Sequence, residues 1–196
     1  MTATSHEPGS PRRQLLRWAG WYGFLCGLLC ALVGLRYVFA FGMPESNLTV
    51  IYILTAFIGQ FVLLGVLPML VLVVPVVIVI PDKRYVLPIG IVLAAIVLSL
   101  VVLDANIFAQ YRYHLSRLTV EIFEPSTWLL TGLFLVIFLV LQTLFAVNIW
   151  QRVSNTKKYA GLWVGIVLVV VWAVGQSIHI WADATANSAV TSFNRF

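Results

Sequence analysis

Long apolar runs separated by short polar segments dominate the chain. The apolar runs cover about residues 18–41, 48–80, 86–108, 128–150 and 161–182. A helix needs about 20 apolar residues to cross the ~30 Å hydrocarbon core of a bilayer, and each run reaches that length. The pattern therefore predicts an all-α membrane protein built as a bundle of five transmembrane helices.

The second run is too long for one straight span. Its 33 residues would extend about 50 Å as an unbroken helix. Pro68 and Pro75 lie within it, and proline removes a helical hydrogen bond and clashes with the preceding turn. We expect this helix to kink, tilt or break at the prolines. Gln60 is its deep polar side chain and is expected to bond to a neighbouring helix.

Small residues in the first run predict close helix contact. Cys26 and Cys30 lie one helical turn apart, a spacing poorly suited to a disulfide. We interpret them as small packing residues, with a reactive or metal-binding pair as the alternative. The same run carries a glycine stripe that lets two helices approach closely: Gly20, Gly23, Gly27 and Gly34.

Composition supports the membrane assignment. The chain is 61% hydrophobic and only 10% charged, whereas soluble domains carry about 25% charge. The net charge of +5 does not indicate nucleic-acid binding, because the basic residues lie at the ends of the spans. We expect a disordered cytoplasmic tail over residues 1–14, a five-span membrane domain over 15–184, and the start of a periplasmic linker over 185–196.

The charges at the span ends predict the orientation. The segments that five spans would place on one side of the membrane, with the N-terminus, carry eight basic and two acidic residues. The segments on the other side carry four basic and five acidic residues. The positive-inside rule places the first side and the N-terminus in the cytoplasm, and the C-terminus in the periplasm. The eight basic residues serve as a topology signal and are candidates for contact with a cytoplasmic protein partner or anionic lipid: Arg12, Arg13, Arg17, Lys83, Arg84, Arg152, Lys157 and Lys158.

The longest polar segment lies between the third and fourth spans, at residues 104–128. Tyr111, Leu115, Leu118 and Ile122 recur at helical spacing, so they fall on one face of a helix. An apolar face opposite a charged one is typical of a helix in the plane of the membrane surface. We therefore predict an interfacial helix on the periplasmic side.

Two groups of candidate site residues gather on that side. Phosphate-bearing lipid head groups suit arginine, so the candidate lipid-binding residues are Arg36, Arg112, Arg117, Tyr111 and His114. A polar network closing the ends of the spans is expected from Asp104, His179 and Asp183. Snorkelling of Arg36, a metal site, and a proton or ion path remain alternatives for these charges. The sequence has no nucleophile–base constellation or phosphate loop, so we expect neither catalysis nor a cofactor.

Three short motifs occur in a characteristic order. They are GLRYVF at residues 34–39, LDANIFAQYRYHLS at 103–116 and HIWADA at 179–184, followed by Thr191. In these motifs the chain resembles the N-terminal five-span domain of the PbgA/YejM family of Gram-negative inner-membrane proteins. The resemblance implies a regulator of lipopolysaccharide supply that contacts a protease adaptor and thereby shields lipid A deacetylase. It also implies contact with lipopolysaccharide or cardiolipin.

The sequence departs from the family pattern after the fifth span. Residues 185–190 read TANSAV where the family has an aromatic-Arg-Pro run, and residues 1–196 do not include the family's sulfatase-like periplasmic domain. We expect either an isolated membrane domain or a naturally short relative. A lipid transporter and a plain membrane anchor for a periplasmic domain are the alternative functions.

Overall fold

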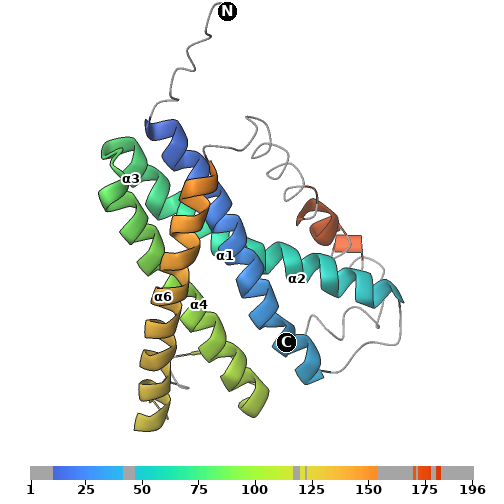
Figure 1. The fold of residues 1–196 in the computed structure, drawn as a ribbon. Helices are drawn as coiled ribbons and strands as arrows, with labels where there is room; N and C mark the ends of the chain where they lie inside the picture. Colours follow the sequence, from blue (N-terminus) through green and yellow to red (C-terminus); the bar gives the residue numbers. More distant parts are fainter. Residues whose placement is uncertain are drawn as a thin grey trace, which may run out of the picture.

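A computed structural model describes residues 11–41, 47–116, 120–121, 123–153, 170, 172–177 and 180–181. These residues are mostly helical, contain no strand, and include four helices long and apolar enough to cross a membrane. This confirms the all-α membrane fold (Figure 1). The elements are α1 (Pro11–Phe41), α2 (Asn47–Pro68), η1 (Met69–Val73), α3 (Val74–Val79), α4 (Lys83–Tyr111) and α6 (Pro125–Val153).

The fifth predicted span lies largely outside the described residues. Within residues 161–182, positions 170, 172–177 and 180–181 are described, and all of them are helical. The predicted linker over 185–196 lies entirely outside them.

The start of the first helix differs from the predicted boundary. α1 begins at Pro11, so residues 11–14 belong to the helix and the prediction that they form a disordered tail is wrong. Proline is favoured at the first helical position because its missing N–H has no partner there. Leu15 is only 1% exposed, and its burial holds this first turn against the bundle.

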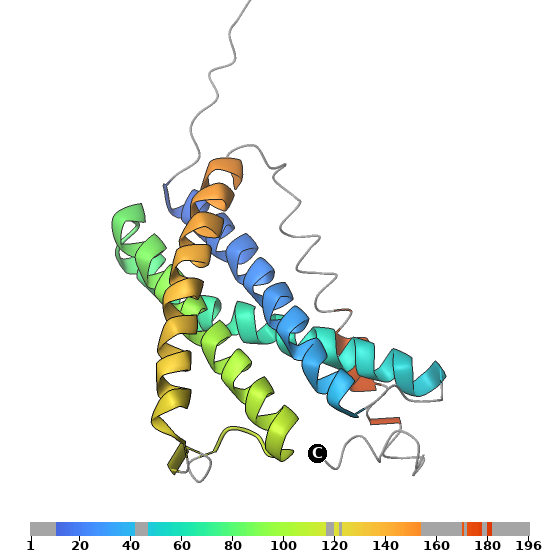
Figure 2. The same ribbon diagram turned by 60° about the horizontal axis from the view of Figure 1, so that its bottom comes forward.

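α1 and α2 cross where glycines remove the side chains. A Cβ atom added to Gly27 would lie 2.6 Å from Val62 Cα, and one added to Gly65 would collide with the Gly27 backbone. The two backbones therefore touch, as the glycine stripe predicted. A Cβ atom added to Gly20 would have no neighbour within 4 Å, so Gly20 lies outside the crossing. Figures 1 and 2 both show α2 running obliquely across α1.

The long second span is interrupted by a π turn. η1 follows Pro68, and the Val74 N–H donates to the Met69 carbonyl oxygen, five residues back. Pro75 then occupies the first turn of α3, where its missing N–H is tolerated. The expected interruption is thus a locally wider helical turn. Hydrogen bonds between residues five apart satisfy backbone groups there without a break in the helix.

Two aromatic side chains of α1 form the centre of the core. Trp18 and Tyr22 are fully buried and stack with ring centroids 4.8 Å apart. The Trp18 Nε1–H donates to the Ala146 carbonyl oxygen at 3.1 Å, and the Tyr22 hydroxyl donates to Gln142 Oε1 at 2.8 Å. These bonds tie α1 to α6 within the apolar layer.

The cysteines confirm the packing interpretation. Cys26 and Cys30 are buried and form no disulfide. Cys26 Sγ lies 3.4 Å from Gln142 Oε1, so the thiol adds to the same polar contact. Gln60 is exposed, and its side chain does not make the predicted bond to another described helix. The interhelical amide among the described residues is Gln142.

Candidate functional site

α4 positions the most polar group of the bundle near one of its ends. Asp82 caps the start of the helix by accepting the Arg84 N–H at 2.9 Å, a common N-cap contact. The helix ends at Tyr111 because Arg112 adopts a left-handed conformation with φ 62°. The Arg112 N–H closes the last turn on the Phe108 carbonyl oxygen at 3.0 Å.

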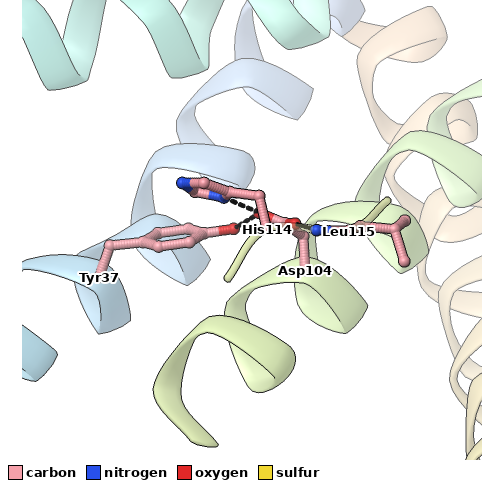
Figure 3. Close-up of polar contacts among 4 residues, drawn as sticks. All are labelled: Tyr37, Asp104, His114 and Leu115. Atoms are coloured by element: carbon pink, nitrogen blue, oxygen red, sulfur yellow. Dashed lines mark hydrogen bonds and ion pairs between the residues drawn. The ribbon is translucent and has the colours of Figure 1, made fainter. Parts of the chain in front are cut away.

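The left-handed residue turns the chain back over the end of α4. A left-handed conformation outside glycine costs on the order of 1 kcal/mol, so contacts of the returning segment must offset it. Those contacts converge on Asp104. We call Tyr37, Asp104, His114 and the Leu115 backbone N–H the Asp104 junction, which Figure 3 shows.

Both carboxylate oxygens of Asp104 are engaged. Oδ1 accepts the backbone N–H of Leu115, and Oδ2 accepts the hydroxyl of Tyr37. His114 Nδ1 lies 2.9 Å from Oδ2. The side chain of Asp104 is 22% exposed, and a partly desolvated carboxylate needs such donors. The junction therefore joins α1, α4 and the returning segment through one acid.

Aromatic rings cover the junction. Phe108 and His114 stack with centroids 4.8 Å apart, and Tyr37 lies 5.2 Å from Phe108. Phe61 of α2 extends the cluster, with its centroid 5.9 Å from that of Tyr37. Ring contacts at these separations stabilise packing beyond simple burial. Three helices thus meet at the Asp104 end of the bundle.

The junction has partners that the sequence analysis did not assign to Asp104. His179 and Asp183, predicted to join it, lie outside the described residues. Tyr37 was missed as a partner, although it stands in the Arg-Tyr pair at the end of the first span. His114, a candidate lipid-binding residue, pairs with Asp104 in this structure.

Of the remaining candidate lipid-binding residues, those that the structure describes stand close to the junction in the chain. Arg36 is exposed on α1 beside Tyr37. Tyr111 is the last residue of α4 and is 56% exposed, and Arg112 is exposed in the turn after it. Arg117 lies outside the described residues.

The interfacial helix does not start where it was predicted to start. Tyr111 ends α4, and Leu115 lies in the non-helical segment after Arg112, so these two residues do not share one helix. The left-handed turn at Arg112 separates them. Helical residues resume at Val120, whose N–H donates to the Ser116 carbonyl oxygen at 3.0 Å. Leu118 and Ile122 lie outside the described residues.

The predicted cytoplasmic residues that the structure describes gather at the opposite end, which we call the basic end. The start of α1, the turn between α3 and α4, and the end of α6 lie together there (Figure 1). Leu15, Val77, Val86 and Val153 from these elements share one buried cluster. Lys157 and Lys158 lie outside the described residues. The described basic residues here are Arg12, Arg13, Arg17, Lys83, Arg84 and Arg152.

A bundle of membrane-length helices, with a carboxylate junction at one end and basic residues at the other, defines a multi-span helical membrane domain. The sequence matches the family described as "Domain of unknown function (DUF3413)" over residues 7–196. The chain therefore belongs to this family, and the resemblance to the PbgA/YejM membrane domain is confirmed.

Curated relatives give the family its cellular setting. The chain is 24% identical to "Inner membrane protein YejM" of Salmonella typhimurium and of Salmonella typhi, over 91% of this chain and 32% of each relative. It is 22% identical to an "Uncharacterized protein" of Haemophilus influenzae, over 90% of this chain. The chain thus spans about a third of the length of these relatives.

Proposed function

We propose that the chain is a non-enzymatic, membrane-embedded regulator of lipopolysaccharide synthesis in the bacterial inner membrane. In this role it binds the adaptor of a membrane-bound protease and so protects lipid A deacetylase from degradation. The observation that carries the proposal is the similarity to YejM across 91% of this chain. The N-terminus is cytoplasmic and the Asp104 end periplasmic, in keeping with the positive-inside rule.

The basic end is the proposed contact for the adaptor. A cleft of about 230 Å³ lies there between α1 and α6, lined by Gln14, Trp150, Gln151 and Val153. Tryptophan is enriched at protein interfaces, and the exposed cations of the neighbouring helix ends add a positive rim. A partner with acidic groups around an apolar side chain suits this surface.

The Asp104 end is the proposed contact for lipid phosphate. Arg36 is exposed next to Tyr37, Arg112 is exposed two residues before His114, and Arg117 follows in the same segment. Guanidinium groups bind phosphate oxygens in pairs of parallel hydrogen bonds. The junction holds the backbone that carries Arg36 and Arg112, so phosphate of lipopolysaccharide or cardiolipin meets a fixed site.

The interior of the bundle favours regulation over transport. The buried polar side chains of the described core are Ser99 and Gln142, and neither is charged. Each already bonds within the bundle, Ser99 to the Ala95 carbonyl oxygen and Gln142 to Tyr22. Transport paths usually carry ionisable groups through the bilayer centre.

Expression of the chain in cells depleted of their own relative tests the proposal. A regulator raises the abundance of lipid A deacetylase, measured by immunoblot, whereas a plain anchor leaves it unchanged. The double variant Lys83→Glu with Arg84→Glu should abolish the rise. The charge-preserving pair Lys83→Arg with Arg84→Lys is the matched control. Unchanged deacetylase despite normal membrane levels of the wild-type chain would contradict the regulatory role.

A further inference from the structure

A second site lies between α4 and α6, outside the Asp104 junction. A cleft of about 480 Å³ opens between the end of α4 and the start of α6. This volume falls in the range of small-molecule sites. From α4 the cleft is lined by Leu103, Asn106 and Gln110, which share one face at helical spacing.

The lining of the cleft changes from apolar to polar along the helices. α4 runs toward the Asp104 end and α6 runs away from it. Leu103 and Phe134 therefore lie deeper in the membrane, and Gln110 and Glu124 lie at the mouth. A lipid has the same gradient, with acyl chains toward the bilayer centre and a polar head group at the surface.

The charge of the lining indicates which head group fits. Glu124 is the one acidic side chain among the described residues that line the cleft, and no lysine, arginine or histidine is among them. The Ser126 hydroxyl donates to Glu124 Oε2 at 3.3 Å. Asn106 and Gln110 make no side-chain hydrogen bond to another described residue, so their amide oxygens can accept from a ligand.

We propose that this cleft binds the primary ammonium head group of a zwitterionic phospholipid. The ammonium donates one hydrogen to the Glu124 carboxylate and others to the amide oxygens of Asn106 and Gln110. An acyl chain lies along Leu103 and Phe134. The site is distinct from the arginine contacts around the junction, whose ligand is anionic, and it does not depend on the regulatory role.

Lipid retention by the purified full chain tests the site. The protein is equilibrated with vesicles containing equal parts of phosphatidylethanolamine, phosphatidylcholine and phosphatidylglycerol, and retained lipid is measured by native mass spectrometry. Phosphatidylethanolamine should exceed each of the other two about fivefold or more. The trimethylated head group has no N–H to donate, and the glycerol head group has no positive charge.

One substitution and a matched control locate the contact. Glu124→Gln should reduce phosphatidylethanolamine retention about tenfold, as expected for a lost charge-assisted hydrogen bond. Glu121→Gln removes the same charge from the same segment, outside the cleft lining, and should leave retention unchanged. Size-exclusion profiles establish that both variants are folded. The lipid preference of the wild-type chain needs no variant, so the proposal stays testable if Glu124→Gln does not fold.

Three results would overturn the proposal. The first is equal retention of phosphatidylethanolamine and phosphatidylcholine, and the second is equal loss in the two glutamate variants. The third is displacement of the lipid by soluble glycerophosphoethanolamine at equal concentration, because that molecule has the head group without the acyl chains.

Discussion

Tyr37 of α1 donates its hydroxyl hydrogen to Asp104 of α4, and so joins two membrane spans at the same end. The tyrosine ring also packs on Phe108 and Phe61. One side chain therefore supplies both a hydrogen bond and a ring contact, and the two contributions can be separated by substitution.

Removal of the Tyr37 hydroxyl should destabilise the bundle. Tyr37→Phe keeps the ring and leaves the partly buried Asp104 carboxylate one donor short, which costs about 1 to 2 kcal/mol. Denaturant titration of the purified protein in detergent measures this loss. Tyr113→Phe is the control, because Tyr113 is 70% exposed. Equal stability of the two variants would show that the Tyr37–Asp104 hydrogen bond does not stabilise the fold.

The pairing should also appear as an interaction energy. Asp104→Asn combined with Tyr37→Phe should cost less than the sum of the single changes, by about 0.5 kcal/mol or more, because the two residues share one bond. The same detergent titrations supply all four free energies. Strict additivity would show that the two side chains act independently.

The glycine crossing of α1 and α2 should tolerate no added methyl group at its centre. Gly27→Ala places Cβ against the Val62 backbone, and overpacking of this kind costs about 1 to 3 kcal/mol. Gly20→Ala meets no neighbour within 4 Å and should be neutral or slightly stabilising, since alanine favours the helix. Melting temperatures in one detergent compare the pair, and a larger loss for Gly20→Ala would contradict the crossing.

The two glutamines of the spans should differ in their contribution to stability. Gln142→Leu removes the side-chain acceptor of the buried Tyr22 hydroxyl, at a cost of about 1 kcal/mol. Gln60→Leu changes an exposed side chain and should have little effect. Unfolding of both variants in the same detergent checks this, and a similar loss in each would mean that burial does not distinguish them.

The orientation should be visible by cysteine labelling. Cys26 and Cys30 are 4% and 1% exposed, so these native cysteines should react very little with a maleimide while the chain is folded. Tyr113→Cys should react with an impermeant reagent added outside spheroplasts, and Lys83→Cys should react only after lysis. The reverse pattern would invert the proposed orientation and exclude the lipid contacts assigned to the periplasm.

Much of the fold could be predicted from the sequence, because hydrocarbon length and backbone hydrogen bonding leave few choices in a membrane. The apolar runs, the glycine stripe and the prolines of span 2 all report directly on helices. The junction was harder to predict, because Asp104 and Tyr37 stand 67 residues apart. The turn at Arg112 was also hidden, since arginine carries no local signal for a left-handed conformation. A helical pattern continued across that turn and suggested one helix where the chain reverses.

The π turn decides which residues of the second span face the core. Met69, Val73 and Val77 are all buried, at 3%, 0% and 0% exposure. In a regular α-helix, residues four apart do not stay on one line but drift around the helix axis. Each residue of an α-helix advances about 100°, so the extra residue in the wide turn cancels the accumulated drift. If this turn were wound as ordinary α-helix with all of its residues kept, everything after it would rotate by about that angle. Val77 would then turn out of the core, and the inward seam of the span would lose its phase.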